Sequence, residues 1–226
     1  EGSADFAVLP IENSTAGAVD EMYDLLVEFE NYIVGETVIP IQNTLSALPG
    51  TKFDEIERVY SKGVALMQAS KFLEEHGDWQ QISVANTAIA AKKVRDEQDK
   101  SQAAVCSAYA AEVHGLEVLA DNINDESGNC TRFIVVTNQK IFLKDASKIS
   151  LCVEHSHESG SLYHMLSHFI YNDLNMTKIA SRPIKGRPWE YCFFVDFEGN
   201  LEDPAVKNAI RGLREEATNL KILGNY

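Results

Sequence analysis

Residues 131–136, Thr-Arg-Phe-Ile-Val-Val, are the stretch that decides the fold of this chain. Apart from Arg132, the run consists of β-branched and aromatic residues, which predicts a buried strand. A predicted strand at residues 103–106 and a predicted helix at residues 108–114 precede it, and strands and helices alternate in the same way back to the N-terminus. This alternation predicts an α/β domain with a parallel sheet.

The earlier elements follow from the spacing of apolar residues. Residues 5–11 predict a buried strand that ends near Pro10, and residues 12–17 predict the turn after it. Apolar residues then recur at helical spacing from Val19 to Ile33, with acids between them. The remaining predicted elements are a strand-rich segment at 36–48 that stops at Pro49-Gly50, a strand at 56–60, a helix at about 64–75, a strand near 82–84 and a helix that begins at Thr87.

The last part of the chain predicts a different arrangement. Its elements are a strand at 149–155, a helix at 161–171, strands at 176–181 and 189–197, a helix at 203–217 and a strand at 220–223. This βαββαβ order is the ferredoxin-like pattern. Because the charge balance changes over residues 138–147, we place a boundary near residue 147, with one domain at 1–146 and a second at 147–226.

Composition and charge exclude several classes of protein. The 226 residues carry a formal net charge of −14, and no Lys or Arg occurs before Lys52. Nucleic-acid binding requires clustered bases, so we expect no nucleic-acid partner. No apolar run is long enough for a membrane helix, and no signal-peptide pattern opens the chain, so we expect a cytoplasmic protein without a membrane partner. The four cysteines lie far apart and predict reduced thiols.

Signals for a metal, a cofactor or a catalytic nucleophile are weak. His155, His157, His164 and His168 fall within a short segment, and the last two have the i, i+4 spacing of helical metal sites. The helix phase places both opposite the apolar face, and no convincing further ligand accompanies them, so we expect no metal. The motifs GxSxG, GxGxxG and Walker A do not occur, and we expect no cofactor.

Polar residues gather instead at the ends or starts of predicted strands. They are Glu12, Asn13, Ser14, Ser61, Thr87, Thr131 and Arg132. In open α/β sheets, ligands bind outside the carboxyl ends of the strands. Their common placement predicts one cleft.

Longer motifs resemble a known family over nearly the whole chain. Residues 10–17 (Pro-Ile-Glu-Asn-Ser-Thr-Ala-Gly), 48–50 (Leu-Pro-Gly), 59–68 (Val-Tyr-Ser through Gln68), 115–119 (Gly-Leu-Glu-Val-Leu) and 131–133 (Thr-Arg-Phe) together resemble prephenate dehydratase. Residues 160–163 (Gly-Ser-Leu-Tyr), 176–179 (Met-Thr-Lys-Ile), 181–183 (Ser-Arg-Pro) and 188–191 (Pro-Trp-Glu-Tyr) resemble the ACT regulatory domain attached to that enzyme. Several ordered motifs are far more specific than one short pattern.

The resemblance implies a fold, an activity and partners. The fold is a two-lobed dehydratase domain similar to periplasmic binding proteins, followed by a ferredoxin-like ACT domain. The activity is that of a hydro-lyase in phenylalanine biosynthesis, which converts prephenate to phenylpyruvate with loss of water and carbon dioxide. The implied partners are prephenate as substrate, L-phenylalanine as effector and further copies of the chain in a homodimer or homotetramer.

The resemblance also implies roles for individual residues. Thr131 contacts the leaving hydroxyl as an oriented donor or proton relay, because a threonine is too weak an acid to give up a proton unaided. Arg132 offers a bidentate fork to a substrate carboxylate. Glu12 is a candidate acid and Asn13 a neutral polar contact. The other expected substrate contacts are Ser14, Ser61, Gln68, Thr87 and Phe133, and the expected effector contacts are Gly160, Ser161, Leu162, Ser181, Arg182 and Pro183.

Three departures from the family pattern bear on these expectations. The N-terminal part of the catalytic domain should precede Glu1, so the chain looks like a fragment, and some relatives carry chorismate mutase further upstream. Lys62-Gly63 stands where the family usually has His-Pro. Ala180 replaces the usual glutamate before Ser181, and Ser161 replaces an alanine, which leaves the strength and sign of phenylalanine control open.

Each expected site residue also has a structural interpretation. Asn13 and Ser14 can cap the following helix, Arg132 can pair with a structural acid, Ser61 can end a strand and Thr131 is a good strand former. At the level of the whole chain, the alternative to an enzyme is a phenylalanine-binding ACT module attached to an inactive, truncated domain.

Overall fold

The computed structural model describes residues 4–155 and 158–226 of the chain. These residues form two compact units, each of which draws on several segments. Unit 1 holds Glu1–Glu12, Ala18–Val38 and Arg132–Tyr226, and unit 2 holds Asn13–Gly17 and Ile39–Thr131. Thr131 and Arg132, which are neighbours in the expected site, therefore belong to different units. The predicted boundary near residue 147 lies within unit 1, and the division into domains at 1–146 and 147–226 stays a prediction.

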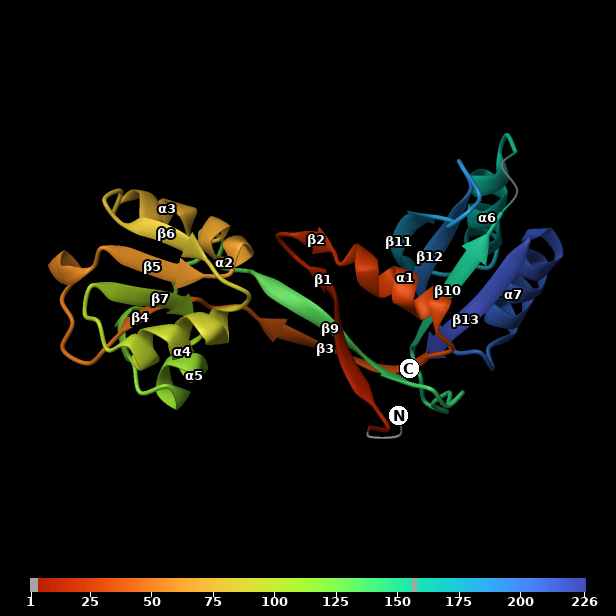
Figure 1. Ribbon diagram of the computed structural model, residues 1–226. Coiled ribbons are helices and arrows are strands. Elements are labelled where there is room, and N and C mark those ends of the chain that lie inside the picture. The colour runs from red at the N-terminus through yellow and green to blue at the C-terminus, as the bar shows by residue number, and fades with distance from the viewer. Residues whose placement is uncertain (1–3, 156–157) are drawn as a thin grey trace. The chain divides into compact units, whose positions relative to one another are not determined.

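Unit 2 is a three-layer α/β structure around a five-stranded sheet. Its strands, in spatial order, are β6 (Gln80–Ser83), β5 (Arg58–Ser61), β7 (Gln102–Cys106), β4 (Thr44–Ala47) and β8 (Glu117–Ala120). Helices α2 (Gly63–Met67) and α3 (Ser70–Glu74) cover one face, and α4 (Thr87–Glu97) and α5 (Ala108–Val113) cover the other (Figure 1). A short 3₁₀ turn, Phe53–Glu55, precedes β5.

The expectation of a parallel sheet in this part of the chain is correct for some strands and wrong for β4. Strand β5 runs parallel to β6 and β7, whereas β4 is antiparallel to both β7 and β8. Helical crossovers join β5 to β6, β6 to β7 and β7 to β8, and parallel strands require such crossovers. Strand β4 connects to β5 without one and enters between β7 and β8 in the opposite direction.

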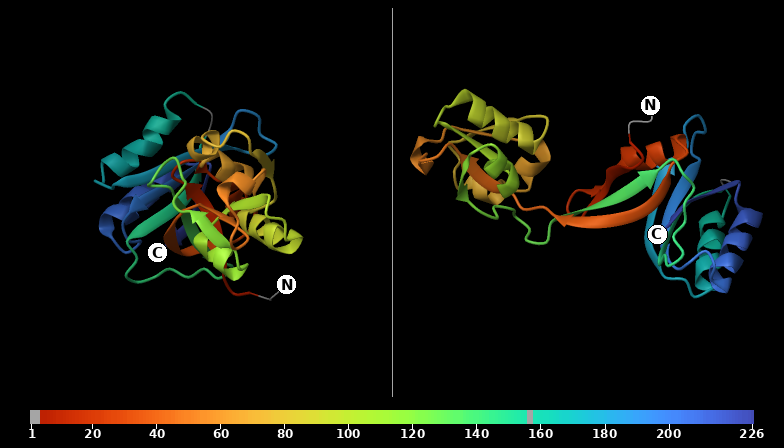
Figure 2. Two further views of the ribbon diagram at one scale, coloured as in Figure 1. Left: turned by 90° about the vertical axis from the view of Figure 1, so that its left-hand side faces the viewer. Right: turned by 90° about the horizontal axis from the view of Figure 1, so that it is seen from below.

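Unit 1 is built on an eight-stranded sheet. In spatial order its strands are β11 (Met176–Pro183), β12 (Tyr191–Glu198), β10 (Lys148–Glu154), β13 (Asn219–Asn225), β3 (Tyr32–Pro40), β9 (Cys130–Thr137), β1 (Ala7–Asn13) and β2 (Gly17–Ala18). Helices α6 (Ser161–Ile170) and α7 (Pro204–Glu216) pack on one face of the β10–β13 part (Figure 2). Helix α1 (Asp20–Glu28) packs on the opposite face through Tyr23 and Leu26.

The predicted βαββαβ order of residues 147–226 is confirmed. All six elements occur, and their strands lie in the order β11-β12-β10-β13 with antiparallel pairing. Strand β13 continues the sheet by pairing in parallel with β3, where Gly224 lies opposite Ile33. A Cβ atom at Gly224 would lie 2.3 Å from the carbonyl oxygen of Ile33, so this close approach requires glycine.

Two predictions for single elements are wrong, and one strand was missed. Helix α1 ends at Glu28, and Tyr32 and Ile33 begin β3, because aromatic and β-branched residues favour a strand over a continued helix. The helix predicted at about 64–75 is divided into α2 and α3. Strand β8 was not predicted. Trp189 is 77% exposed with φ of 67°, whereas Trp79 is buried.

Candidate active site

Asn13 organises a polar network where β1 ends. Its Nδ2 group lies 2.8 Å from Asn129 Oδ1, 3.0 Å from Thr131 Oγ1 and 3.1 Å from the Cys130 carbonyl oxygen. Its Oδ1 atom accepts hydrogen bonds from the backbone N–H groups of Thr15 and Ala16, at 3.0 and 2.8 Å. The oxygen is thus fixed by two backbone donors, which identifies Nδ2 as the side that faces Thr131.

The hydroxyl group of Thr131 accepts a hydrogen bond from Asn13 in this network. A threonine hydroxyl has one proton to donate and two lone pairs that accept. Within residues 4–155 and 158–226, Asn13 is its one hydrogen-bond partner, and the amide cannot accept the hydroxyl proton. Thr131 Oγ1 is therefore oriented by Asn13 while its proton stays available to a bound molecule.

A cavity of about 290 Å³ lies beside this network in unit 2. Thr15, Ala16 and Asn129, all of which bond to Asn13, line it. Gln68 at the end of α2 lines it as well, as do Lys71 and Met67. Of the expected site residues, Gln68 thus lines this cavity, whereas Asn13 bonds to three residues that line it and Thr131 bonds to Asn13.

Asn129 is a site residue that the sequence interpretation missed. It is 4% exposed, accepts the amide of Asn13 and lines the cavity. Its own Nδ2 group has no acceptor in the part of the chain that the structure describes. A buried unpaired donor costs about 1–3 kcal/mol, so this group marks a place where a further polar partner would be stabilising. Its position two residues before Thr131 was the available signal.

Ser14 and Ser61, which were expected to contact the substrate, both form hydrogen bonds within the protein through their hydroxyl groups. Ser14 Oγ accepts the backbone N–H of Cys130 at 2.9 Å. Ser61 is fully buried, and its Oγ donates to the Val105 carbonyl oxygen at 2.6 Å, which ties β5 to β7. Ser61 ends β5, as its structural interpretation has it. The interpretation of Asn13 and Ser14 as helix caps is wrong, because α1 begins after Val19 and no side chain caps it.

Two other expected contacts, Thr87 and Phe133, are not among the described residues that line this cavity. Thr87 is the first residue of α4, next to the capping residue Asn86. Phe133 is half-buried on β9. Neither residue has a side-chain hydrogen bond to Asn13, Thr131 or Gln68 in this part of the chain, and their roles stay predictions.

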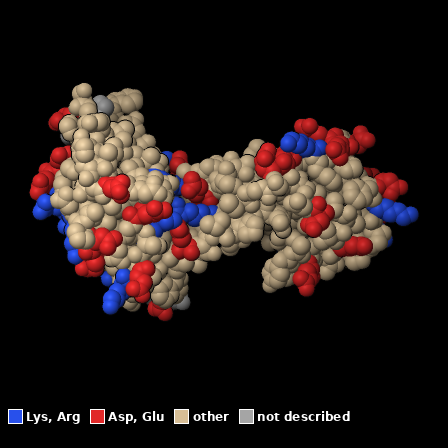
Figure 3. Space-filling model, turned by 180° about the vertical axis from the view of Figure 1, so that it is seen from behind, with Lys and Arg blue, Asp and Glu red and all other residues tan. Residues whose placement is uncertain are grey.

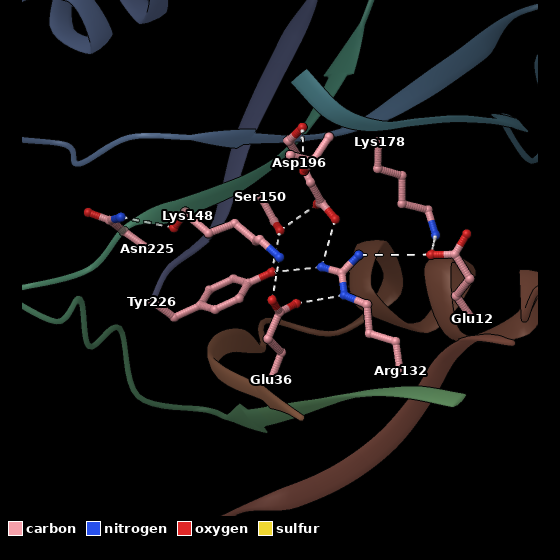
Figure 4. Close-up of polar contacts among 10 residues, drawn as sticks. Glu12, Glu36, Arg132, Lys148, Ser150, Lys178, Asp196, Asn225 and Tyr226 are labelled. Atoms are coloured by element: carbon pink, nitrogen blue, oxygen red, sulfur yellow. Dashed lines mark hydrogen bonds and ion pairs between the residues drawn. The ribbon is translucent and has the colours of Figure 1, made fainter. Parts of the chain in front are cut away.

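Arg132 lies at the centre of an ion-pair network in unit 1 (Figure 4). Its Nε atom donates to Glu36 at 2.6 Å, and its Nη2 atom donates to Asp196 at 2.8 Å and to the Tyr226 hydroxyl at 3.2 Å. Ser150 Oγ donates to the other oxygen of Asp196 at 2.5 Å. The guanidinium group thus joins β9 to β3 and β12. These contacts match the structural interpretation, in which Arg132 pairs with acids of the fold.

Burial and charge set the electrostatics of this network. Burial alone would lower the pKa of Arg132, but Asp196, Tyr226 and Glu36 outweigh it and raise that pKa. Burial, with a smaller contribution from Asp196, raises the pKa of Tyr226. For Glu36, burial is outweighed by the hydrogen bond from Lys148 and by Arg132, so its pKa lies below the ordinary value. The network is a set of mutually neutralised charges at neutral pH.

Glu12, the expected acid, belongs to the same network. Its Oε2 atom accepts from Lys178 Nζ at 2.7 Å and lies 3.9 Å from Arg132 Nη1. Lys178 is on β11 and its side chain is 10% exposed. A carboxylate in such a pair acts as an acceptor, and here it connects the end of β1 to β11.

The expected effector residues lie on two elements of unit 1. Gly160, Ser161 and Leu162 form the start of α6, where Gly160 has φ of 88° and caps the helix. Ser181 and Pro183 are exposed on β11, which is the edge strand of the sheet. Arg182, between them, is bound to Asp20 and Asp24 of α1. Effector contacts by these residues stay predictions.

The histidine cluster has structural contacts in the described residues. His168 packs against Gly212 of α7, and its Nε2 lies 3.2 Å from a Glu216 oxygen, so the prediction that it faces away from the packed side of α6 is wrong. His155 is buried, and burial lowers its pKa. His157 lies outside the described residues. Residues 4–155 and 158–226 contain no group of three potential metal ligands.

Charge on the surface follows the composition. The face in Figure 3 carries acidic side chains over both units, with basic side chains dispersed among them. Within the described ranges, no helix is both long enough and apolar enough to cross a membrane.

Comparison with known proteins gives a consistent result. The family model for prephenate dehydratase matches residues 1–141. The bifunctional chorismate mutase/prephenate dehydratase of Stutzerimonas stutzeri is 36% identical over 226 residues, which are 100% of this chain and 61% of that protein. Arogenate dehydratase/prephenate dehydratase 6 of Arabidopsis thaliana is 35% identical over 99% of this chain and 58% of its own length. The chain thus spans about six tenths of these relatives.

Solved structures extend the similarity to the whole fold. A prephenate dehydratase from Arthrobacter aurescens, in complex with L-Phe, is 31% identical with a TM-score of 0.90, over 100% of this chain and 75% of that chain. A structure described as GqqA, a novel type of quorum quenching acylase, is 32% identical with a TM-score of 0.88, over 99% of this chain and 82% of its own. From the matched family model, the identity across the chain and the shared fold, we conclude that this chain belongs to the prephenate dehydratase family.

Proposed function

We propose that the protein to which this chain belongs is a prephenate dehydratase. The reaction takes prephenate and one proton to phenylpyruvate, water and carbon dioxide. The ring carboxylate leaves as carbon dioxide, its bonding electrons enter the ring, and the ring hydroxyl leaves as water after it gains the proton. Formation of the aromatic ring drives the step, so the protein has to orient the substrate and assist the departing hydroxyl.

The observation that carries this proposal is the hydrogen bond from Asn13 to Thr131. It directs the threonine hydroxyl as a donor beside a cavity that Gln68 and Asn129 line. A donor aimed at the departing oxygen stabilises the charge that develops there and can pass a proton to it. Thr131 needs no unusual acidity for this role, because it stabilises the transition state as a donor.

We further propose that residues 147–226 form an ACT domain that binds L-phenylalanine and regulates the reaction. The ferredoxin-like order of these elements supports this assignment, and so does the L-Phe complex of the Arthrobacter relative. The chain spans 61% of the length of the Stutzerimonas relative.

Association of copies through the second domain is part of the same proposal. Tyr163, Ile170 and Tyr171 are exposed on one side of α6, and Ile179 is exposed on the edge strand β11. Exposed apolar residues next to an open strand edge favour association with another chain. A cytoplasmic homodimer or homotetramer is therefore the assembly that we propose.

Two rival functions are tested by the same preparation. A non-catalytic module would bind phenylalanine without converting prephenate. A quorum quenching acylase, suggested by the description of one structural relative, would remove an acyl group from its substrate. The dehydratase is favoured because the family model and several curated relatives carry that name.

The deciding experiment measures phenylpyruvate formation from prephenate, with and without phenylalanine, by this chain and by a version extended at its N-terminus. We expect turnover by the extended chain and a change in rate with phenylalanine. Phenylalanine binding without turnover in either chain would support the binding module. Release of an acyl group from a quorum-sensing signal molecule, without phenylpyruvate formation, would support the acylase.

A further inference from the structure

Two cations of β11 bind residues on either side of the segment that carries Asn13. Lys178 and Arg182 are four residues apart on this strand and therefore share one face. Lys178 binds Glu12, the residue directly before Asn13. Arg182 binds Asp20 and Asp24, at the start of the helix that follows. One strand thus contacts both ends of the connection formed by residues 13–19.

The contacts have the geometry of specific ion pairs. Arg182 Nε and Nη2 donate to the two oxygens of Asp24 at 3.0 and 2.9 Å, and Nη1 lies 2.7 Å from Asp20 Oδ2. A bidentate pair of this kind fixes direction as well as distance. Lys178 Nζ also lies 5.1 Å from the ring centre of Tyr23 in α1, which holds the ammonium group between strand and helix.

The connection between these anchors has further contacts of its own. Its strand β2 pairs with β1, and its backbone is held by Ser14 N–H to Cys130 O, by the Asn13 side chain and by Val19 N–H to Ile11 O. Thr15 and Ala16, which line the cavity, are exposed. The direction of Asn13, and through it that of the Thr131 hydroxyl, depends on these contacts and on where the two ends of the connection are fixed.

We propose that Lys178 and Arg182 are positioning residues for the reaction, which hold residues 13–19 in place so that Asn13 orients Thr131. This inference rests on the proposed dehydratase function. It also gives β11 a second role, because this strand carries the expected effector residues Ser181, Arg182 and Pro183. A molecule that displaces Arg182 from α1 would release one end of the connection and lower the rate.

The first test measures hydrogen exchange of residues 13–19 by mass spectrometry in the full chain. The variants are Lys178→Met, Asp24→Asn and their combination. The control is Lys185→Met, because Lys185 pairs with Glu28 of α1 in an exposed ion pair at 3.4 Å. We expect exchange at residues 14–19 to become about tenfold faster in the three variants and to stay unchanged in the control. Unchanged exchange in Lys178→Met and Asp24→Asn would overturn the proposal.

The second test follows the kinetics of the same variants in the N-terminally extended chain. A lost positioning contact should lower kcat by about tenfold and leave KM within about twofold, since Asn13 acts through the departing hydroxyl. Normal kcat with accelerated exchange would overturn the positioning role. If the wild type shows no turnover at all, the proposed function fails, while the exchange result still decides whether β11 holds the segment. In Asp24→Asn, Arg182 keeps Asp20 as a partner, so this variant still tests the proposal if Lys178→Met does not fold.

Discussion

Thr131 and Arg132 are neighbours in the sequence, yet their side chains are in opposite situations. Thr131 accepts one hydrogen bond from Asn13 and keeps its own proton available beside a cavity. Arg132 binds Glu36, Asp196 and Tyr226, and its side chain is 16% exposed. Adjacent residues of a strand point to opposite sides, so one motif supplies a chemical group on one side and a structural anchor on the other. Motif membership alone does not separate these two roles.

The largest expected effect concerns the stability of the Arg132 network. Arg132→Met leaves the carboxylates of Asp196 and Glu36 without their shared cation, and breaking a buried pair in this way costs about 3–5 kcal/mol. Urea unfolding of the purified variant would measure this loss. A variant with wild-type stability and a much higher KM for prephenate would contradict the structural role of Arg132, because it would assign Arg132 to a substrate carboxylate.

The next effect concerns the direction of the hydrogen bond at Thr131. Asn13→Asp keeps an acceptor for the backbone N–H groups of Thr15 and Ala16 but removes the donor to Thr131. The threonine proton would then turn to the new carboxylate, and we expect kcat to fall by about a hundredfold. Asn86→Asp is the matched control, since Asn86 accepts only a helix N–H in the described residues and aspartate caps equally well. Equal kcat values for Asn13→Asp and Asn86→Asp would contradict a hydrogen bond donated by Asn13 to Thr131.

Features of the fold that depend on residues close in the sequence could be predicted, whereas features that depend on residues distant in the sequence could not. Helix α4 begins at Thr87 as predicted, because Asn86 caps it locally. The division between α2 and α3 has no local signal. Asp125, which lies 55 residues further along the chain, accepts the backbone N–H and the hydroxyl of Ser70, at the start of α3. That division makes Gln68 a helix end on the cavity.

The site shows the same limit. Of the expected residues, Gln68 lines the cavity and Asn13 bonds to Thr131. The sequence could not show that Arg132 pairs with Asp196 and Glu36, since these acids stand 64 and 96 residues away. Asn129 was missed because a turn asparagine is common and its burial depends on the fold. Ser61 was expected to contact substrate because strand ends carry ligands in α/β sheets, whereas its bond to Val105 depends on the pairing of β5 with β7.

A smaller effect is expected at Ser61, where the structural contact predominates. Ser61→Ala removes the bond to the Val105 carbonyl and should lower the free energy of unfolding by about 1 kcal/mol, with kcat and KM unchanged. Thermal unfolding and steady-state rates of the same sample test both parts. An increased KM at normal stability would restore Ser61 to the substrate contacts.

The smallest effect is the contribution of Glu36 to pH dependence. Its pKa in the folded chain lies below the ordinary 4.5, so its stabilising contribution is present above that value and is lost as the pH falls through the folded pKa. Glu36→Gln should therefore flatten the loss of stability on acidification below about pH 4.5. Urea midpoints from neutral to acidic pH would measure it, and parallel curves for variant and wild type would argue against a paired Glu36.

The central claim is that the Thr131 hydroxyl acts on the departing group while Arg132 holds the fold. The most direct measurement compares phenylpyruvate formation by Thr131→Ala and Thr131→Ser in the N-terminally extended chain, with the unfolding midpoint of each. We predict that the alanine variant loses about a hundredfold to a thousandfold in kcat at unchanged stability, while the serine variant, which keeps the donor, stays within about tenfold of wild type. Wild-type turnover by Thr131→Ala would contradict the claim.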